Sequence, residues 1–422
     1  MLGGFTLAVA LPVEAALGRF GTGWFAHAQV HGHLQVIGFA GLFVVGVSTR
    51  LAPRFTNRTL HDPSIRVAFW LLASGLFLRA LGQPLAQHAA FAAVMLIGGA
   101  LEAAGALLAL VTLTRTLRPW AAPRSASAAL LNASAFWLTV QALLSLWWLR
   151  DLAVEGERIL PANRNALLLE AQTFGFLLSA LAGVGLRSFP TFFGAPPPPS
   201  RYAWGFAAVL QAGLVVWLLG LGLQLDAGGA VAVRLATAGQ LLLGTAVAAI
   251  AVLVGWWRHG SRLAPASRHF IWSLRAIAAS LTLTGVLLAL SAARALIEDV
   301  EVTNAQLDAI RHVFLIGVIT LAIVVMGQLI LPEFASERLV RQPAQWRGRV
   351  FAVTLPLAAV FRGVLPLAGL SGEARYWSMS IGGLLGLASV IAFAVLYWRA
   401  RQSHRTYLAR VAGWRGREVP LA

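Results

Sequence analysis

The chain is a succession of apolar runs, each long enough to cross a lipid bilayer, joined by short polar connections. A membrane-spanning helix takes ~20 residues, and runs of about that length recur through all 422 residues. Hydrophobic residues make up 58% of the chain and charged residues 12%, which is too little charge to cover the surface of a soluble protein of this size. The sequence therefore predicts an all-α integral membrane protein.

Hydropathy predicts twelve membrane-spanning helices. The first is the least typical, because it is short and contains Pro12 and Glu14. The predicted spans cover residues 2–18, 27–51, 66–83, 89–115, 126–149, 165–190, 204–224, 232–257, 271–294, 308–331, 349–370 and 377–398.

Arginine is distributed unevenly between the two sets of connections. The net charge is +17, and arginines concentrate after the even-numbered spans and in a basic tail, 399–422, whereas most acidic residues follow the odd-numbered spans. Because basic residues stay on the cytoplasmic side, this pattern predicts that both termini are cytoplasmic. It also favours contact with the lipid bilayer and its anionic head groups over contact with nucleic acid.

The chain contains no cysteine. This excludes iron–sulfur clusters and covalently attached c-type haem. Any metal must be held by histidine, methionine or carboxylate side chains.

Three segments of the chain resemble one another. They are His31–Phe55, Leu168–Phe192 and Ala309–Phe334, and aligning their prolines also aligns one glycine and one phenylalanine in each. Regular self-similarity indicates a repeated unit, although helices rich in leucine and glycine can also look alike by chance. The spacing predicts three pseudo-symmetric four-helix units, approximately 1–124, 125–262 and 263–398.

Histidines gather at the outer ends of the even-numbered spans. The repeat places His33, Glu170 and His312 at equivalent positions. Two imidazoles on two facing helices are what a six-coordinate haem iron needs, so His33 and His312 are predicted haem ligands. The alternative for each histidine is a solvated side chain at the lipid–water interface.

His31 and His33 cannot share a metal, because at ~100° per residue they point about 200° apart. His31 is therefore a candidate ligand of a second haem or of copper. His27 and His31 lie on one helix face, and His88 opens a neighbouring span, so these three form a candidate site for copper or iron.

Glu102 and Glu170 fall inside predicted spans, where ionisable groups are costly and usually functional. Glu102 lies in the middle of its span, and Glu170 lies in the second repeat. Both are candidates for a buried proton relay. The alternative for Glu102 is an ion pair with a buried arginine such as Arg79.

The segment HGHLQVIGFAGLFVVGVSTRLAPRF resembles the haem-ligating helix of haem-copper oxidase subunit I, especially in C-type oxidases and nitric oxide reductases. It also resembles the NnrS family of twelve-helix haem and copper membrane proteins linked to nitric oxide stress. The family carries an early HxH, a later GGR-x-x-P-F-F-like motif and a further histidine-bearing helix. The resemblance assigns these to His31 and His33, to GLRSFPTFF at 185–193, and to His312. The order of these motifs along the chain and the length of the chain resemble the NnrS family more than the oxidases.

The sequence also departs from the oxidases. Their double-histidine helix belongs to the last unit, and they need three further histidines on the sixth and seventh helices. Here the sixth span offers Glu170 and Gln172 instead, and the seventh contains no histidine. This argues against reduction of oxygen or nitric oxide at a binuclear centre of the oxidase type.

The resemblance implies a haem-binding protein of the bacterial inner membrane, with copper as a second cofactor candidate and nitric oxide as a candidate ligand. Two alternatives remain open. One is an oxidase-like oxidoreductase subunit that carries electrons between quinol and a redox partner protein. The other is a transporter or assembly factor that moves metal or haem.

Overall fold

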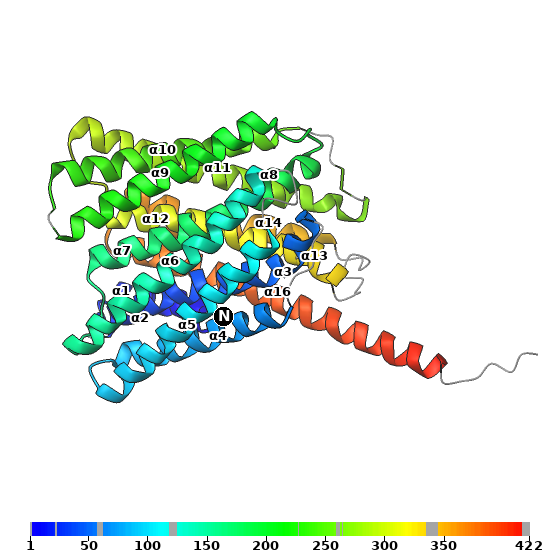
Figure 1. The fold of residues 1–422 in the computed structure, drawn as a ribbon, viewed down its shortest axis with the longest axis horizontal. Coiled ribbons are helices and arrows are strands. Elements are labelled where there is room, and N and C mark those ends of the chain that lie inside the picture. The colour runs from blue at the N-terminus through cyan, green and yellow to red at the C-terminus, as the bar shows by residue number, and fades with distance from the viewer. Residues whose placement is uncertain are drawn as a thin grey trace, which may run out of the picture.

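The computed structural model describes residues 2–21, 23–56, 62–117, 125–226, 228–258, 262–263, 265–334 and 345–415 (Figure 1). All regular elements in these ranges are helices, and eleven of them are long and apolar enough to cross a membrane. The prediction of an all-α membrane protein is confirmed. The observed spans lie where hydropathy predicted them, usually with a few more residues at each end.

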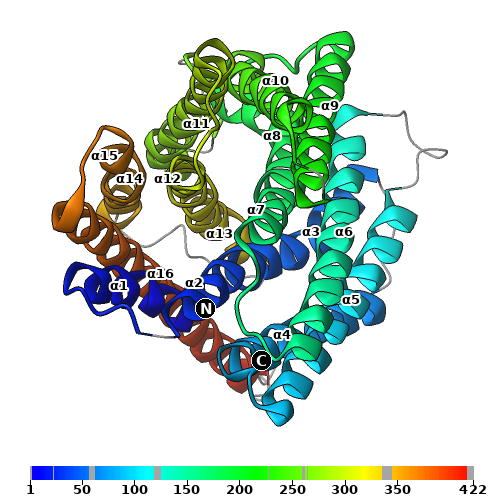
Figure 2. The ribbon, with the colours of Figure 1, turned by 90° about the vertical axis from the view of Figure 1, so that its left-hand side faces the viewer.

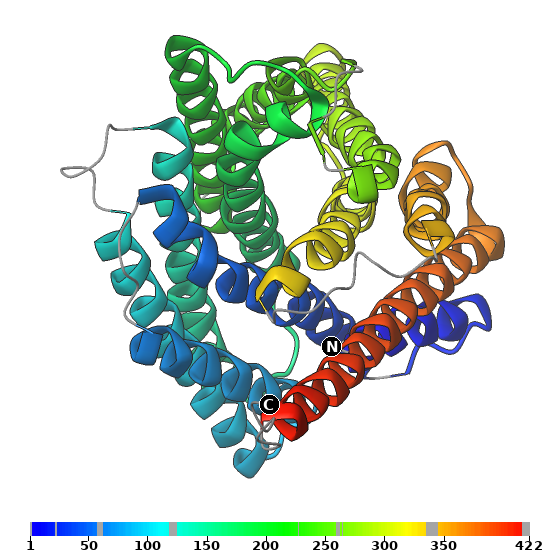
Figure 3. The same ribbon diagram turned by 90° about the vertical axis from the view of Figure 1, so that its right-hand side faces the viewer.

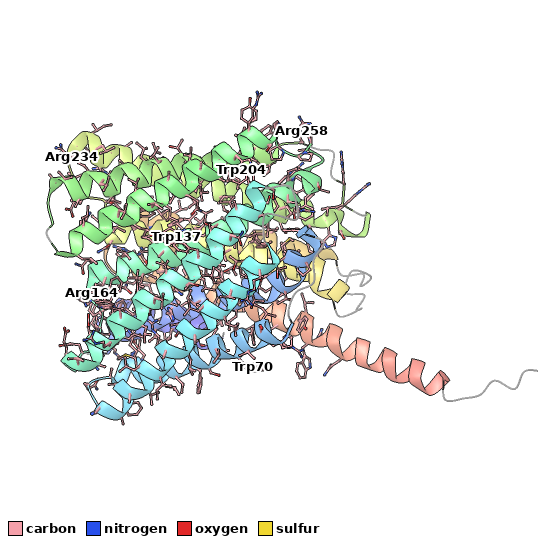
Figure 4. The ribbon with its side chains drawn as sticks, in the orientation of Figure 1. Trp70, Trp137, Arg164, Trp204, Arg234 and Arg258 are labelled. Carbon is pink, nitrogen blue, oxygen red and sulfur yellow. The ribbon has the colours of Figure 1, made fainter. Side chains whose placement is uncertain are left out.

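The surface of the bundle is apolar between its two ends. Trp70 is 67% exposed, and Phe77, Val252 and Leu290 are also largely exposed. Arg164 and Arg234 lie at one end of the bundle and Arg258 at the other (Figure 4). Such a surface suits lipid around the middle and water at the ends.

Three long helices cross the middle of the bundle, and each contains an internal π-helical turn. The contacts of η1 with η3 and with η5 bring the three together, and the other helices surround them (Figures 2 and 3). The three central helices are α2 (Trp24–His33), η1 (Leu34–Gly41) and α3 (Leu42–Thr56); α7 (Ala162–Glu170), η3 (Ala171–Leu178) and α8 (Ser179–Phe193); and α12 (Asn304–Phe314), η5 (Leu315–Thr320) and α13 (Leu321–Phe334).

The π-helical turns fall at corresponding positions of the three similar segments. A shift of 137 residues aligns Pro53 with Pro190 and also aligns η1 with η3. The shift that aligns Pro53 with Pro332 aligns the last residue of η1 with the last residue of η5. π-helical turns are rare and concentrate at functional sites. The prolines do not end their helices, because α3 and α8 both continue for three residues beyond them.

The surrounding helices pack as antiparallel neighbours through glycine. A Cβ on Gly75 would lie 2.6 Å from the Gly98 carbonyl, and a Cβ on Gly239 would lie 2.2 Å from the Trp217 amide nitrogen, so these backbones touch directly. The surrounding helices are α4 (Asp62–Gly82), η2 (Gln83–Leu85), α5 (Ala89–Thr116), α6 (Ala126–Glu155), α9 (Ser200–Asp226), α10 (Ala230–Val254), η4 (Pro265–Phe270), α11 (Ile271–Glu298), α14 (Gln345–Ala359), η7 (Val360–Val364) and α15 (Leu365–Leu367).

The two terminal helices complete the bundle. Helix α1 (Leu2–Ala16) contains 15 residues, or about 22 Å, and is shorter than the eleven candidate spans. It packs against α2 and α16. Helix α16 (Gly372–Arg415) contains 44 residues and extends well beyond the end of the bundle (Figure 1).

Candidate functional site

A large cavity lies between α1, α2, α12 and α16 and is also lined by Ile159 and Leu160 of the α6–α7 connection. Its volume is about 600 Å³, within the range of small-molecule and cofactor sites. The walls near the middle of the bundle are apolar, with Val36 and Phe39 of η1 facing Ile316 and Ile319 of η5. The polar side chains that line it include His31, Gln35, Asn165, Asn304, Asp308, Arg311, His312, Arg362, Arg375 and Tyr376.

His31 reaches the cavity from α2 with one ring nitrogen already engaged. Its Nδ1 lies 2.7 Å from the Gly4 carbonyl of α1, and because a carbonyl only accepts, Nδ1 carries the proton. Its Nε2 has no hydrogen-bond partner among the described residues. Donation from one ring nitrogen to a carbonyl fixes the tautomer and leaves the other nitrogen as a metal ligand.

His312 reaches the same cavity from α12 with the same arrangement. Its Nδ1 lies 2.7 Å from the Asp308 carbonyl and 3.4 Å from the Asp308 carboxylate. Nε2 again lacks a hydrogen-bond partner in the described part of the chain. His31 and His312 interact electrostatically, so the cavity brings together two imidazoles supplied by two different helices.

Beside His312, an ion pair fastens α12 to α7. Arg311 Nη1 donates to Glu170 Oε1 at 2.5 Å, and both side chains are buried. Arg311 Nη2 also lies 3.6 Å from the Asp308 carboxylate. Glu170, a predicted relay residue, therefore acts here as the counter-charge that holds the His312-bearing helix in place.

His33 lies in a separate, buried polar network. Its Nε2 is 2.6 Å from Glu102 Oε2 and 3.0 Å from Arg79 Nη1, and its Nδ1 is 3.2 Å from the Gln172 amide. The structure thus brings Glu102 together with both His33 and Arg79. Glu102 Oε1 and Gln172 Oε1 are buried without a hydrogen-bond partner, a situation that ordered water commonly relieves.

The network continues to the end of the bundle that carries the α6–α7 connection. Arg79 donates to Ser145 Oγ at 2.6 Å and to Gln83 Oε1 at 3.2 Å. Gln83 donates to Gln29 Oε1 at 3.1 Å, and the Gln29 amide exchanges two hydrogen bonds with the Leu160 backbone. These contacts tie α2, α4, α5 and α6 together.

The geometry favours His31 over His33 as the partner of His312. Both ring nitrogens of His33 already face protein groups, and the described lining of the cavity contains His31 and His312 but not His33. Because His31 and His33 point to opposite sides of α2, only one of them can face α12. The predicted pairing of His33 with His312 differs from the pair that the cavity brings together.

The predicted metal site of His27, His31 and His88 is not assembled. His27 Nδ1 lies 2.9 Å from the Gly23 carbonyl at an exposed position, and His88 is the exposed N-cap of α5. Within the described ranges, no group of three histidine or carboxylate side chains is placed to hold a metal ion. Copper therefore remains a prediction.

Sequence reasoning missed four charged residues of the cavity: Asp308, Arg311, Arg362 and Arg375. A signal was present, because all four fall within candidate membrane spans. Charged residues inside a membrane usually face a bundle interior or a water-filled cavity.

Comparison with known proteins adds no name to this arrangement. No protein-family model matches the chain, and no curated protein matches it.

Proposed function

We propose that this chain is a haem-binding membrane protein of the NnrS type, and that His31 and His312 would hold a haem in the large cavity. The observation that carries the proposal is the matched pair of imidazoles. Each donates from Nδ1 to a backbone carbonyl, and each lines the cavity with an Nε2 that has no hydrogen-bond partner among the residues that the structure describes.

The cavity residues fit such a group. Apolar side chains of η1 and η5 form the inner walls, which suits a flat macrocycle. Bound haem would supply one-electron chemistry. The protein would hold the macrocycle by two fixed imidazoles and shield it from water with Phe39 and Ile319.

A finer account of the fold belongs to the same proposal. The chain would have twelve helices in three four-helix units resembling haem-copper oxidase subunit I, with α1 as the twelfth helix. The corresponding positions of η1, η3 and η5 support the repeat. The arginine pattern supports cytoplasmic termini in a bacterial inner membrane, with the cavity opening on the outer side.

The two-histidine arrangement favours electron transfer as the activity. Held by both His31 and His312, a haem would supply one-electron exchange with quinol or a partner protein rather than a binding position for nitric oxide. Handling of nitric oxide would require one histidine to leave the iron. The alternative of metal or haem transport predicts that the cavity releases its ligand readily.

Haem retention in single variants tests the assignment. We expect His31→Ala and His312→Ala each to lose the low-spin spectrum and most of the haem after purification in detergent. His27→Ala is the matched control, because His27 is an exposed histidine of the same helix whose Nδ1 lies 2.9 Å from the Gly23 carbonyl and which does not line the cavity as described.

The variant His33→Gln separates the two possible ligand pairs. If His31 and His312 hold the iron, His33→Gln keeps the low-spin spectrum, since an amide can still hydrogen-bond within the polar network. Loss of haem from His33→Gln, with His31→Ala unaffected and both proteins folded, would contradict the assignment.

A further inference from the structure

A second, narrower pocket lies between the three central helices, on the far side of their π-helical turns from the large cavity. Its walls come from α3, α8 and α13 together with α5 and α6, and its volume is about 120 Å³. Ile319 of η5 lines both spaces. Along α3 the lining runs from Phe43 to Ala52, which is about 14 Å of helix. The pocket is therefore about as long as one leaflet of a hydrocarbon core ~30 Å thick.

The lining of this pocket is apolar. Among the lining residues that the structure describes, only Ser48 and Ser134 carry a hydroxyl group. Ser48 donates to the Val45 carbonyl at 2.7 Å, and Ser134 donates to the Phe176 carbonyl at 2.9 Å. Both hydroxyl protons are thus already used within the protein. A narrow slot with such walls suits a single apolar chain rather than a polar molecule or a ring system.

Protein side chains do not fill the slot. The central helices contact one another where η1 meets η3 and η5, and the pocket lies beyond these contacts. Val44, Val47 and Leu51 line it from α3 and are only partly buried, although α3 is a central helix. Protein interiors are normally close-packed. In a membrane, the apolar chains available to occupy such a space are those of lipids.

An arginine lies directly beyond the apolar slot. Arg187 follows Val184 by three residues on α8, and Phe55 follows Leu51 by four on α3, so each continues the face that lines the pocket. The Arg187 guanidinium carbon lies 4.5 Å from the centre of the Phe55 ring, and Nη1 donates to the Phe55 carbonyl at 3.2 Å.

Arg187 can take a further acceptor. Its side chain is exposed, and the Phe55 carbonyl is its only hydrogen-bond partner among the described residues, whereas a guanidinium has five N–H donors. Helices α3 and α8 both end on the side from which α16 extends (Figure 1). The arginine pattern predicts that this side is cytoplasmic, where basic sites between membrane helices bind anionic head groups.

We infer that the pocket and Arg187 together bind one anionic phospholipid of the cytoplasmic leaflet. One acyl chain occupies the slot between α3, α8 and α13, and the phosphate accepts hydrogen bonds from Arg187. Arginine suits this role because its planar fork donates two parallel bonds to a phosphate. The tail of a quinone would also fit the slot, but it would bring no negative charge to Arg187. The inference is independent of the proposed function, because no part of it involves haem.

The test measures lipid binding to the full chain by native mass spectrometry, after delipidation in a mild detergent. The probes are phosphatidylglycerol and a diacylglycerol with the same acyl chains, so that only the phosphate head group differs. We expect one phosphatidylglycerol per chain, bound at least about tenfold more tightly than diacylglycerol, because charge-assisted hydrogen bonds contribute this much to affinity. Arg187→Gln should remove the preference. Ala180→Leu, which enlarges a pocket-lining side chain, should weaken the binding of both lipids.

The matched control is Arg201→Gln. Arg201 is also exposed and lies over an aromatic ring, with its guanidinium carbon 4.7 Å from the centre of the Tyr202 ring, but it does not line the pocket as described. This variant should keep the full preference for phosphatidylglycerol.

Three results would overturn the inference. One is equal binding of the two lipids by the unmodified chain, a comparison that needs no variant to fold. Another is a set of equivalent phosphatidylglycerol molecules whose binding Arg187→Gln leaves unchanged, which would mean that the lipids only coat the bundle. The third is displacement of phosphatidylglycerol by an equimolar long-chain quinone, which would assign the slot to quinone instead.

Discussion

The electrostatic interaction of Arg79 with Glu102 allows a quantitative test of the buried polar network. The two side chains are 3% and 2% exposed, and both contact His33 Nε2, at 3.0 and 2.6 Å. The guanidinium nitrogen and the carboxylate oxygen therefore lie within about 5.6 Å of each other. At an effective dielectric constant of about 20, this separation corresponds to an attraction of about 3 kcal/mol.

Removing one partner should cost more than removing both. Glu102→Met leaves Arg79 buried without a counter-charge, and Arg79→Met leaves Glu102 buried without a counter-charge. We expect each substitution to lower the free energy of unfolding by about 3–5 kcal/mol. The double variant leaves no buried charge and should lose far less than the two losses added together. Methionine is the replacement because it is unbranched, and Gly75 packs closely against Glu102 Cγ.

The assay is equilibrium unfolding in mixed micelles of a mild detergent and dodecyl sulfate, followed by far-ultraviolet circular dichroism. The four proteins form a double-mutant cycle, and the coupling energy should be about 3 kcal/mol. Additive losses, with a coupling below about 0.5 kcal/mol, would refute the reasoning that the two charges stabilise each other.

Two further predictions use the same unfolding assay. A Cβ on Gly220 would lie 2.3 Å from the Ala236 amide nitrogen, so Gly220→Ala should separate α9 from α10 and lower the free energy of unfolding by about 1–3 kcal/mol. The control is Gly205→Ala on the same helix, where an added Cβ would meet nothing within 4 Å and the unfolding midpoint should stay unchanged. Equal effects of the two substitutions would contradict this packing. Thr303 and Gln306 form a capping box at the start of α12, so Thr303→Ala should cost about 1 kcal/mol, and an unchanged midpoint would show that the cap contributes nothing.

The sequence predicted the helices well because hydropathy reports directly on burial in lipid. The span predicted at 89–115 is α5, Ala89–Thr116, and the span predicted at 165–190 is the central helix Ala162–Phe193. α1 was the hardest case, because its 15 residues fall below the length that a bilayer crossing needs.

The partners of the site residues could not be predicted to the same degree. His31 and His33 lie on opposite sides of α2, so which of them faces α12 depends on how α2 is rotated about its axis, and hydropathy carries little information on that rotation. The π-helical turn η1 begins directly after His33. It changes the direction of the side chains along this helix, and no residue pattern predicted it. The surroundings of Glu102 were easier, because a carboxylate in a membrane needs a partner: Arg79 was one of the alternatives, and both side chains contact His33 Nε2.

The most direct test of the central claim is the electron paramagnetic resonance spectrum of the oxidised, detergent-purified protein, with haem quantified on the same sample. Two axial imidazoles predict a low-spin ferric signal at about one haem per chain, which disappears in His31→Ala and in His312→Ala but not in His27→Ala. A purely high-spin signal, a low-spin signal that survives both substitutions, or a haem-free protein from haem-replete cells would contradict the account.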